Sequence, residues 1–120
     1  MKIAVTSQNY RTVTGHAGKT RRFLVYEATP GGTPVEIDRL DLDKVMTMHE
    51  FRNNAGSHPL DQMDVLITAS AGAGFIQKMF TRSVAVVVTG EEDPVQAVND
   101  LLDNNIKPPA PDSCNHHGHE

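Results

Sequence analysis

The sequence predicts a single α/β domain built on a five-stranded sheet of mixed strand direction, flanked by helices. Three observations support this fold class. An amino-terminal apolar strand is followed by two strands joined by a turn, two later apolar strands alternate with helices, and 120 residues suit one hydrophobic core. Strands joined by a tight turn pair antiparallel, whereas strands joined through a helix run parallel. Both directions are therefore expected in one sheet.

The amino-terminal half predicts three strands. Residues 2–6 form a short apolar run, and residues 22–28 and 34–40 flank the turn sequence Thr29-Pro30-Gly31-Gly32-Thr33. Within residues 34–40, apolar and polar side chains alternate imperfectly, which is typical of a strand at a sheet edge. Residues 41–56 predict an irregular, partly helical excursion.

The second half predicts two strand–helix units. Residues 64–69 and 83–89 are nearly continuous apolar runs, as buried parallel strands require. Residues 74–80 predict a helix with an apolar stripe formed by Phe75, Ile76, Met79 and Phe80. A last helix begins after the N-cap Asp93, with Pro94 in its first position, and ends before Asn104.

Composition excludes several classes of function. The net charge of −4 argues against a general nucleic-acid binder. One cysteine excludes an internal disulfide and, with no signal peptide expected, indicates a reducing cytoplasm. No apolar run approaches the roughly 20 residues of a membrane-spanning helix.

The carboxyl-terminal residues predict a disordered tail. Three of the four residues 108–111 are proline, so we expect a folded domain over 1–106 and an extended tail over 107–120. The tail ends in a thiol and imidazole cluster of Cys114, His116, His117 and His119. Sulfur and nitrogen donors at this spacing suit a divalent transition metal such as zinc, copper, nickel or iron. The alternatives are a remnant of an expression tag and a solvated tail that binds metals weakly.

One histidine in the domain lies on a glycine-containing loop, Gly15-His16-Ala17-Gly18. Glycine permits unusual backbone angles and close approach of other groups, so the imidazole is well placed to bind a metal. The alternative is a turn with an incidental polar side chain. His49 and His58 are further candidate ligands, although His49 can serve local packing and His58 can begin a helix.

Several segments resemble, in order, the nitrogenase iron–molybdenum cofactor biosynthesis family, the domain type of NifX, NafY and the carboxyl-terminal part of NifB. The matching segments are residues 1–7, 15–18, 22–27, 58–69, 71–75 and 92–98. The resemblance thus covers roughly residues 1–103. Ala17 departs from the pattern, because the family usually has phenylalanine there, and this removes an aromatic wall from beside the His16 loop.

The resemblance implies a ribonuclease H-like topology and a site for an anionic cluster. The cargo implied is the iron–molybdenum cofactor or a precursor iron–sulfur cluster, and the partners implied are nitrogenase-type or cofactor-assembly proteins. A carrier of such a cluster needs one or two exchangeable ligands and a positive rim. The expected cofactor-binding residues are His16, Gly15, Gly18, Lys19, Arg21, Gly72 and Gly74. Arg22 adds nearby charge, and the 72–74 turn can offer backbone amides at a helix amino terminus. A solvated basic face is the alternative for Lys19, Arg21 and Arg22.

Enzyme functions fit the residues poorly. A nuclease of the ribonuclease H type needs clustered carboxylates, and residues 2–6 contain none. Cys114 lies in a flexible tail that cannot hold it beside a base, and no P-loop or dinucleotide fingerprint is present. The first hypothesis is a non-enzymatic cluster carrier. The alternatives are a metal-trafficking or sensing module that uses the tail, and a regulatory interaction domain that keeps only the fold.

Overall fold

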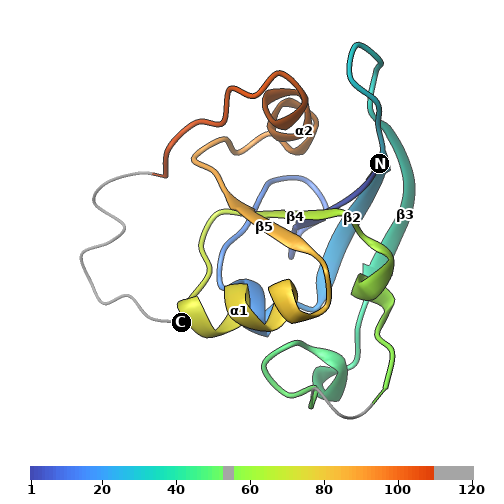
Figure 1. Ribbon diagram of the computed structural model, residues 1–120, viewed down its shortest axis with the longest axis vertical. Coiled ribbons are helices and arrows are strands. Elements are labelled where there is room, and N and C mark those ends of the chain that lie inside the picture. Colours follow the sequence, from blue (N-terminus) through green and yellow to red (C-terminus); the bar gives the residue numbers. More distant parts are fainter. Residues whose placement is uncertain (53–55, 110–120) are drawn as a thin grey trace.

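A computed structural model describes residues 1–52 and 56–109, which form a five-stranded sheet (Figure 1). The strands are β1 (Lys2–Thr6), β2 (Arg22–Glu27), β3 (Val35–Asp41), β4 (Val65–Thr68) and β5 (Ala85–Val88). Their order is β3-β2-β1-β4-β5. β1 pairs antiparallel with β2 and β2 with β3, whereas the β1–β4 and β4–β5 pairs are parallel. The predicted mixed sheet and ribonuclease H-like topology are confirmed.

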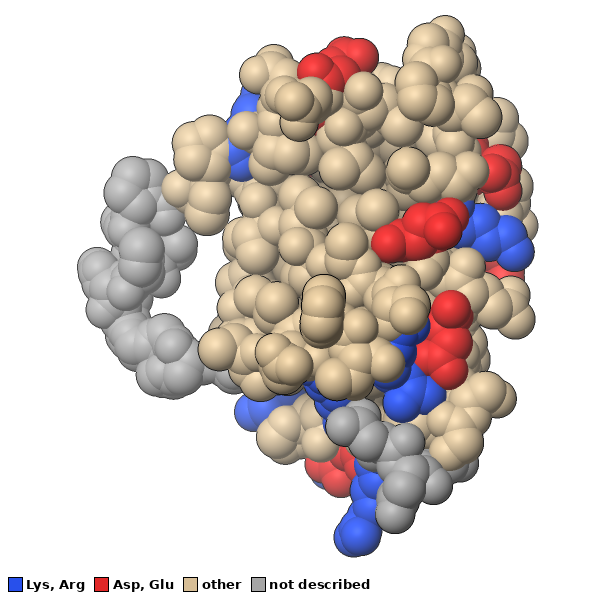
Figure 2. Space-filling view, in the orientation of Figure 1, with Lys and Arg blue, Asp and Glu red and all other residues tan. Residues whose placement is uncertain are grey.

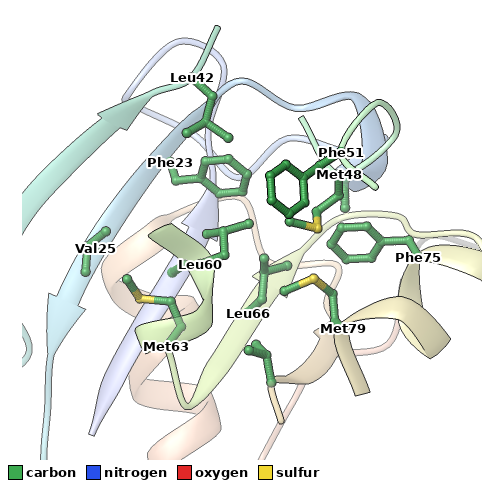
Figure 3. Close-up of a cluster of buried hydrophobic side chains, with 13 residues drawn as sticks. Phe23, Val25, Leu42, Met48, Phe51, Leu60, Met63, Leu66, Phe75 and Met79 are labelled. Carbon is green, nitrogen blue, oxygen red and sulfur yellow. The ribbon is translucent and has the colours of Figure 1, made fainter. Parts of the chain in front are cut away.

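Each face of the sheet is covered by one α-helix in the described part of the chain (Figure 1). α1 (Ala73–Thr81) and α2 (Pro94–Leu102) contribute to two separate hydrophobic clusters. Side chains alternate across β1, so Ala4 joins the cluster of α1 while Ile3 and Val5 join that of α2. Figure 3 shows the first cluster, in which Phe75 and Met79 of α1 meet strand residues such as Leu66.

The local signals for α2 and for the β2–β3 turn are both confirmed. The Asp93 carboxylate accepts hydrogen bonds from the backbone N–H groups of Val95 and Gln96, and Pro94 opens the helix. In the turn between β2 and β3, Gly31 has φ +82°, a conformation that glycine adopts without steric cost. β3 lies at a sheet edge, as its imperfect alternation predicted.

The apolar stripe predicted for α1 is wrong in half of its members. Phe75 and Met79 are buried, but Ile76 is 40% exposed and Phe80 73% exposed. Residues four apart lie on one face of a helix, so the 75/79 pair meets the sheet. The 76/80 pair is rotated by about 100° and faces solvent.

The parallel strand predicted within residues 83–89 is present, but it is less buried than expected. β5 is the second edge of the sheet; Ala85 is exposed, and the three valines that follow it are only partly buried. An edge strand has a neighbour on one side only, so its side chains are covered less than those of β4, which lies between β1 and β5.

Residues 41–52 take an irregular path that includes a 3₁₀ turn, Lys44–Met46. Beyond this turn the chain is held against α1, because Lys78 Nζ donates hydrogen bonds to the backbone carbonyls of Met48 and Phe51. The backbone N–H of His49 also donates to Gly18 O at 2.7 Å. The excursion is thus tied both to α1 and to the loop that follows β1.

Lys107, which the sequence assigned to the tail, is bound to the domain. Its Nζ lies 2.7 Å from the Asp100 carboxylate and 2.9 Å from that of Glu91. Its carbonyl accepts the N–H of Gly90 at 3.0 Å. No helix within residues 1–52 and 56–109 is long and apolar enough to cross a membrane.

Candidate functional site

An open cleft of about 610 Å³ lies where three segments of the chain converge. These segments are the loop after β1, the end of the irregular excursion, and the first turns of α1. The lining residues are His16, Gly18, Lys19, Met48, His49, Gly72, Ala73, Gly74, Phe75 and Lys78. Clefts of 300–1,000 Å³ are the size in which small ligands bind.

His16 occupies the loop in a strained backbone conformation. Its φ of 54° and ψ of 53° lie in the left-handed region, which non-glycine residues seldom adopt and which clusters at functional sites. Its N–H donates to Ser70 Oγ at 2.8 Å. The positive φ therefore lies at the histidine itself, whereas Gly15 and Gly18 lack it.

Of the two properties expected of the loop glycines, Gly15 shows the close approach of another group and not an unusual backbone angle. A Cβ atom at this position would lie 2.4 Å from Ser70 Oγ, so only glycine lets the loop approach that hydroxyl. At Gly18 the nearest neighbour of such a Cβ would be Phe75 Cδ1 at 3.8 Å, and at Gly74 nothing would lie within 4 Å. Among Gly15, Gly18 and Gly74, Gly15 is therefore the position at which a Cβ atom would clash with a neighbour.

Hydroxyl groups at the carboxyl ends of β1 and β4 hold this loop. Thr6 Oγ1 donates to Thr14 O at 2.6 Å, and Thr68 Oγ1 lies 3.2 Å from Thr14 O and 3.1 Å from Ser70 O. Ala17 N–H donates to Ser70 O at 3.2 Å. Ligands of open α/β sheets bind in such crevices beyond the carboxyl ends of parallel strands.

The amino terminus of α1 forms another wall of the cleft. Gly72 is the N-cap and provides no side chain to the first turn, so the initial N–H groups are left for solvent or ligand. A helix amino terminus favours negative charge. This end of α1 is therefore suited to an anion.

The cleft lining is cationic and contains no carboxylate. Lys19 and the two imidazoles of His16 and His49 are exposed, whereas Lys78 is half-buried. Burial, and secondarily the charge of Arg82, lowers the pKa of Lys78. Its ammonium is held by the carbonyls of Met48 and Phe51, so it fixes one wall of the cleft as well as contributing charge.

Arg21 and Arg22 lie outside the cleft lining. Arg21 Nε donates to Leu42 O at 2.7 Å, and its guanidinium lies 3.7 Å from Asp41. Arg22 Nε lies 3.6 Å from the same carboxylate. Both arginines therefore serve the junction of β2 and β3, and Lys19 is the member of the predicted basic group that reaches the cleft.

His58 is buried and caps a short 3₁₀ helix, Pro59–Gln62. Its Nδ1 accepts the N–H of Leu60 at 3.0 Å, so the proton resides on Nε2, which donates to Met46 O at 2.6 Å. Burial lowers the pKa of this imidazole. Both ring nitrogens are engaged, and the residue lies outside the cleft lining.

Ala17 points into the core, where it is 1% exposed, rather than into the cleft. The aromatic wall comes from Phe75 instead, which lines the cleft and, with Met48 and Phe51, caps the core (Figure 3). Met48, Phe75 and Lys78 were not anticipated as lining residues. The four-residue spacing of Gly74 and Lys78 was a usable signal, because it places both on one helix face.

The metal-ligand chemistry in the cleft consists of two imidazoles and the thioether of Met48. Within residues 1–52 and 56–109, no group of three or more His, Cys, Asp or Glu side chains is arranged to hold a metal ion. Cys114, His116, His117 and His119 lie outside the described residues. A bare hard cation needs oxygen ligands, which this lining lacks, whereas an anionic cluster with a vacant site for imidazole fits its donor set.

Comparison with known proteins gives one family and several similar structures, two of which are described below. The sequence model of the family described as "Dinitrogenase iron-molybdenum cofactor" matches residues 1–104. The crystal structure of PH0822 aligns with a TM-score of 0.67 and 12% identity over 89% of this chain and 94% of that one. The apo form of the orange protein from Desulfovibrio gigas aligns with a TM-score of 0.57 and 21% identity over 91% and 92%. A search of curated proteins finds no significant match.

Proposed function

The chain belongs to the dinitrogenase iron–molybdenum cofactor family, and from this premise we propose that it is a non-enzymatic carrier of an anionic iron–sulfur-type cluster. The cargo is the iron–molybdenum cofactor or a precursor cluster, and the cleft is where it binds. The observation that carries this proposal is the composition of the lining, with two imidazoles, two lysines and a helix amino terminus and no carboxylate.

His16 is the first ligand in this proposal. It is exposed on a loop that is fixed by Ser70 and by the hydroxyl groups at the ends of β1 and β4. Because the loop backbone is already held in place, its ordering adds little to the entropic cost of binding through His16. The strained φ of His16 is consistent with a conformation retained for binding.

His49 is the second nitrogen donor, and the two lysines balance the charge of the cargo. The His49 backbone is bonded to Gly18, so both histidines belong to one connected wall. Lys78 is restrained by two carbonyls, whereas Lys19 is exposed and can follow the cargo. The positive charges of the two lysines stabilise a bound anion electrostatically, and neither lysine has to form a covalent bond to it.

The openness of the cleft supports transfer rather than permanent retention. Few protein ligands and a solvent-exposed mouth let a second protein approach the cargo and replace the imidazoles. Partners of this kind are nitrogenase-type or cofactor-assembly proteins. The cleft lining contains no serine, threonine, cysteine or carboxylate side chain, which supports binding and release rather than catalysis.

The test is anaerobic incubation with isolated cofactor, or with iron and sulfide, followed by gel filtration and metal analysis of the protein fraction. We expect His16→Ala to lose most of the bound metal and His49→Ala to lose part of it. Arg11→Ala, an exposed cation outside the lining, is the matched control and should retain the wild-type amount.

Two further measurements make the result decisive. The amide spectrum of the sheet should be unchanged in His16→Ala, because an exposed loop side chain contributes little to the core. A chain that ends at Pro109 removes the cysteine and histidines of the tail while keeping the cleft. Full retention by His16→Ala, or complete loss in the shortened chain, would contradict the proposal.

A further inference from the structure

Among residues 1–52 and 56–109, β5 has a strand partner, β4, on one side only. The N–H groups of Ala85 and Thr89 donate to Asp64 O and Thr68 O, on the β4 side. Because successive residues of a strand point their N–H groups to opposite sides, Val87 also faces β4 while Val86 and Val88 face outward. The free edge ends at Gly90, whose N–H is bonded to Lys107 O.

The two edges of the sheet differ in chemistry. β3 carries Glu36, Asp38, Arg39 and Asp41, and the β2–β3 register shifts between Val25 and Tyr26. Charged residues and bulges are the usual protection of an edge against pairing with another chain. β5 has the sequence Ala-Val-Val-Val, with no charge, proline or bulge. It is thus an edge without that protection.

An exposed apolar flank of α1 borders this edge. Lys78 and Arg82 lie on one flank of α1, where their side chains bind Met48 O, Phe51 O and the Asp61 carboxylate. Ile76 and Phe80 occupy the opposite flank, which therefore faces past β5, the last strand of the sheet. Figure 2 shows a face whose middle carries no charged side chain, with acidic and basic residues at its margin.

We infer that β5 and the Ile76–Phe80 flank of α1 bind a second copy of this chain. Two β5 strands related by a two-fold axis pair antiparallel, with Val87 opposite Val87 of the second copy. Val86 of each copy then lies opposite Val88 of the other, and the outward N–H and carbonyl groups of the two residues form hydrogen bonds with each other. Such a contact is self-complementary, because the same patch is used on both chains.

A two-fold contact places the same patch of both chains together, so it requires a face without charge. The chain carries a net charge of −4, so two copies repel wherever their charged surfaces meet. The uncharged face around β5 lets them approach without unpaired charges at the contact. Phe80, 73% exposed, would be covered there and would anchor the contact next to the strand pair.

The test is sedimentation of the full chain over a range of concentrations, with reductant and chelator present to exclude links through the tail. Phe80→Lys places a charge in the contact, and Val88→Pro removes an outward N–H that β4 does not use. Val35→Lys alters an exposed valine on the opposite edge and is the matched control. Hydrogen exchange of the Val86 and Val88 amides is measured on the wild type at low and high concentration.

We expect a wild-type dimer whose Kd rises about tenfold or more in Phe80→Lys and Val88→Pro and stays unchanged in Val35→Lys. The Val86 and Val88 amides should become protected only as the dimer forms, whereas the Val87 amide is protected throughout. A wild type that stays monomeric up to about 1 mM overturns the inference. So does a dimer that both variants leave intact, or one in which the Val86 and Val88 amides exchange as fast as in the monomer.

Discussion

At the scale of single residues, the position of His16 depends on a hydroxyl from a distant part of the sequence. Ser70 Oγ accepts the His16 N–H, and Ser70 O accepts that of Ala17. A side chain at position 15 would clash with this hydroxyl, because a Cβ atom there would lie 2.4 Å from Ser70 Oγ. The sequence indicated the glycine and the histidine, but the partner that explains both lies 54 residues later and comes near only through the β1–β4 pair.

Gly15 and Ser70 should therefore show strongly non-additive effects on unfolding. Gly15→Ala forces Ser70 Oγ away and should cost about 1–3 kcal/mol, as overpacking does. Ser70→Ala should cost about 1 kcal/mol, because it removes one hydrogen bond. In the double variant the clash is absent, so its free energy of unfolding should resemble that of Ser70→Ala. Denaturant titration of the four proteins measures this, and simple additivity would show that the two residues are independent.

His58 should make the fold sensitive to mild acid. Its pKa is lowered in the folded protein, so the neutral form stabilises the fold. This contribution is complete above the unfolded pKa of about 6.5 and is lost as pH falls below that value toward the folded pKa. Arg82 and Lys78 add repulsion to the protonated ring.

His58→Asn keeps an oxygen acceptor for Leu60 N–H but cannot titrate. We expect it to lower stability at pH 7 by about 1–2 kcal/mol, because the bond to Met46 O is lost. Between pH 7 and pH 5 it should lose less stability than the wild type. Denaturant midpoints at both pH values provide the measurement, and equal pH slopes would refute this role of His58.

At the scale of elements, helix periodicity located α1 but did not reveal which apolar residues are buried. Phe75, Ile76, Met79 and Phe80 all satisfy the helical pattern, and a sheet can cover only one face of the helix. Lys78 and Arg82 show which flank of α1 is covered: Lys78 binds Met48 and Phe51 in the irregular excursion, and Arg82 binds Asp61 in the 3₁₀ helix Pro59–Gln62. Without those long-range contacts the sequence cannot distinguish a core stripe from an exposed patch.

The segment after α2 is bound to the domain at Lys107, although its prolines predicted a tail. The Asp100 side chain is buried and accepts hydrogen bonds from Lys107 Nζ and from Gln96 Nε2. The Lys107 hydrogen bond is the main cause that lowers the pKa of Asp100. Proline-rich composition predicted a tail from residue 107 onward, but a single lysine next to those prolines reaches a buried carboxylate.

A chain that ends at Pro109 keeps Lys107 and should therefore unfold at the wild-type midpoint. A chain that ends at Ile106 lacks Lys107, so the buried Asp100 carboxylate loses a partner. We expect this shorter chain to be destabilised by about 1–3 kcal/mol. Lys107→Met in the full chain should reproduce most of that loss. The Asp100 pKa is lowered when folded, so the difference between the two chains should shrink as pH falls through it. Thermal unfolding of the three proteins gives the comparison, and coincident midpoints would show that Lys107 contributes nothing.

At the scale of the whole molecule, topology was predictable and the site only partly so. Turn residues fixed the β2–β3 hairpin, and the helical connections fixed the parallel strands β4 and β5. These signals are local, so a single sequence contains them. The cleft combines three segments, and its Met48, Phe75 and Lys78 become neighbours of His16 only after the sheet forms. Arg21, which was also predicted for the site, lies outside the cleft lining and contacts Asp41 and Leu42.

The charge distribution of the whole molecule makes a last prediction about cargo binding. The chain has a net charge of −4, yet the cleft is lined by Lys19, Lys78 and two histidines and by no carboxylate. An anion is therefore repelled by the molecule at long range and attracted by the cleft at short range. Salt screens exposed charges, with a Debye length of about 10 Å at 0.1 M, and weakens the contribution of Lys19 most.

Lys19→Ala should weaken cluster binding by roughly two- to fivefold at low salt and by less at high salt, because an exposed charge contributes modestly and is screened. Arg11→Ala, which removes the same charge from outside the cleft, should alter binding much less. Anaerobic binding titrations at two salt concentrations separate these effects. If the two variants weaken binding equally, net charge rather than the cleft governs the attraction, and the cationic lining would have no specific part in holding the cargo.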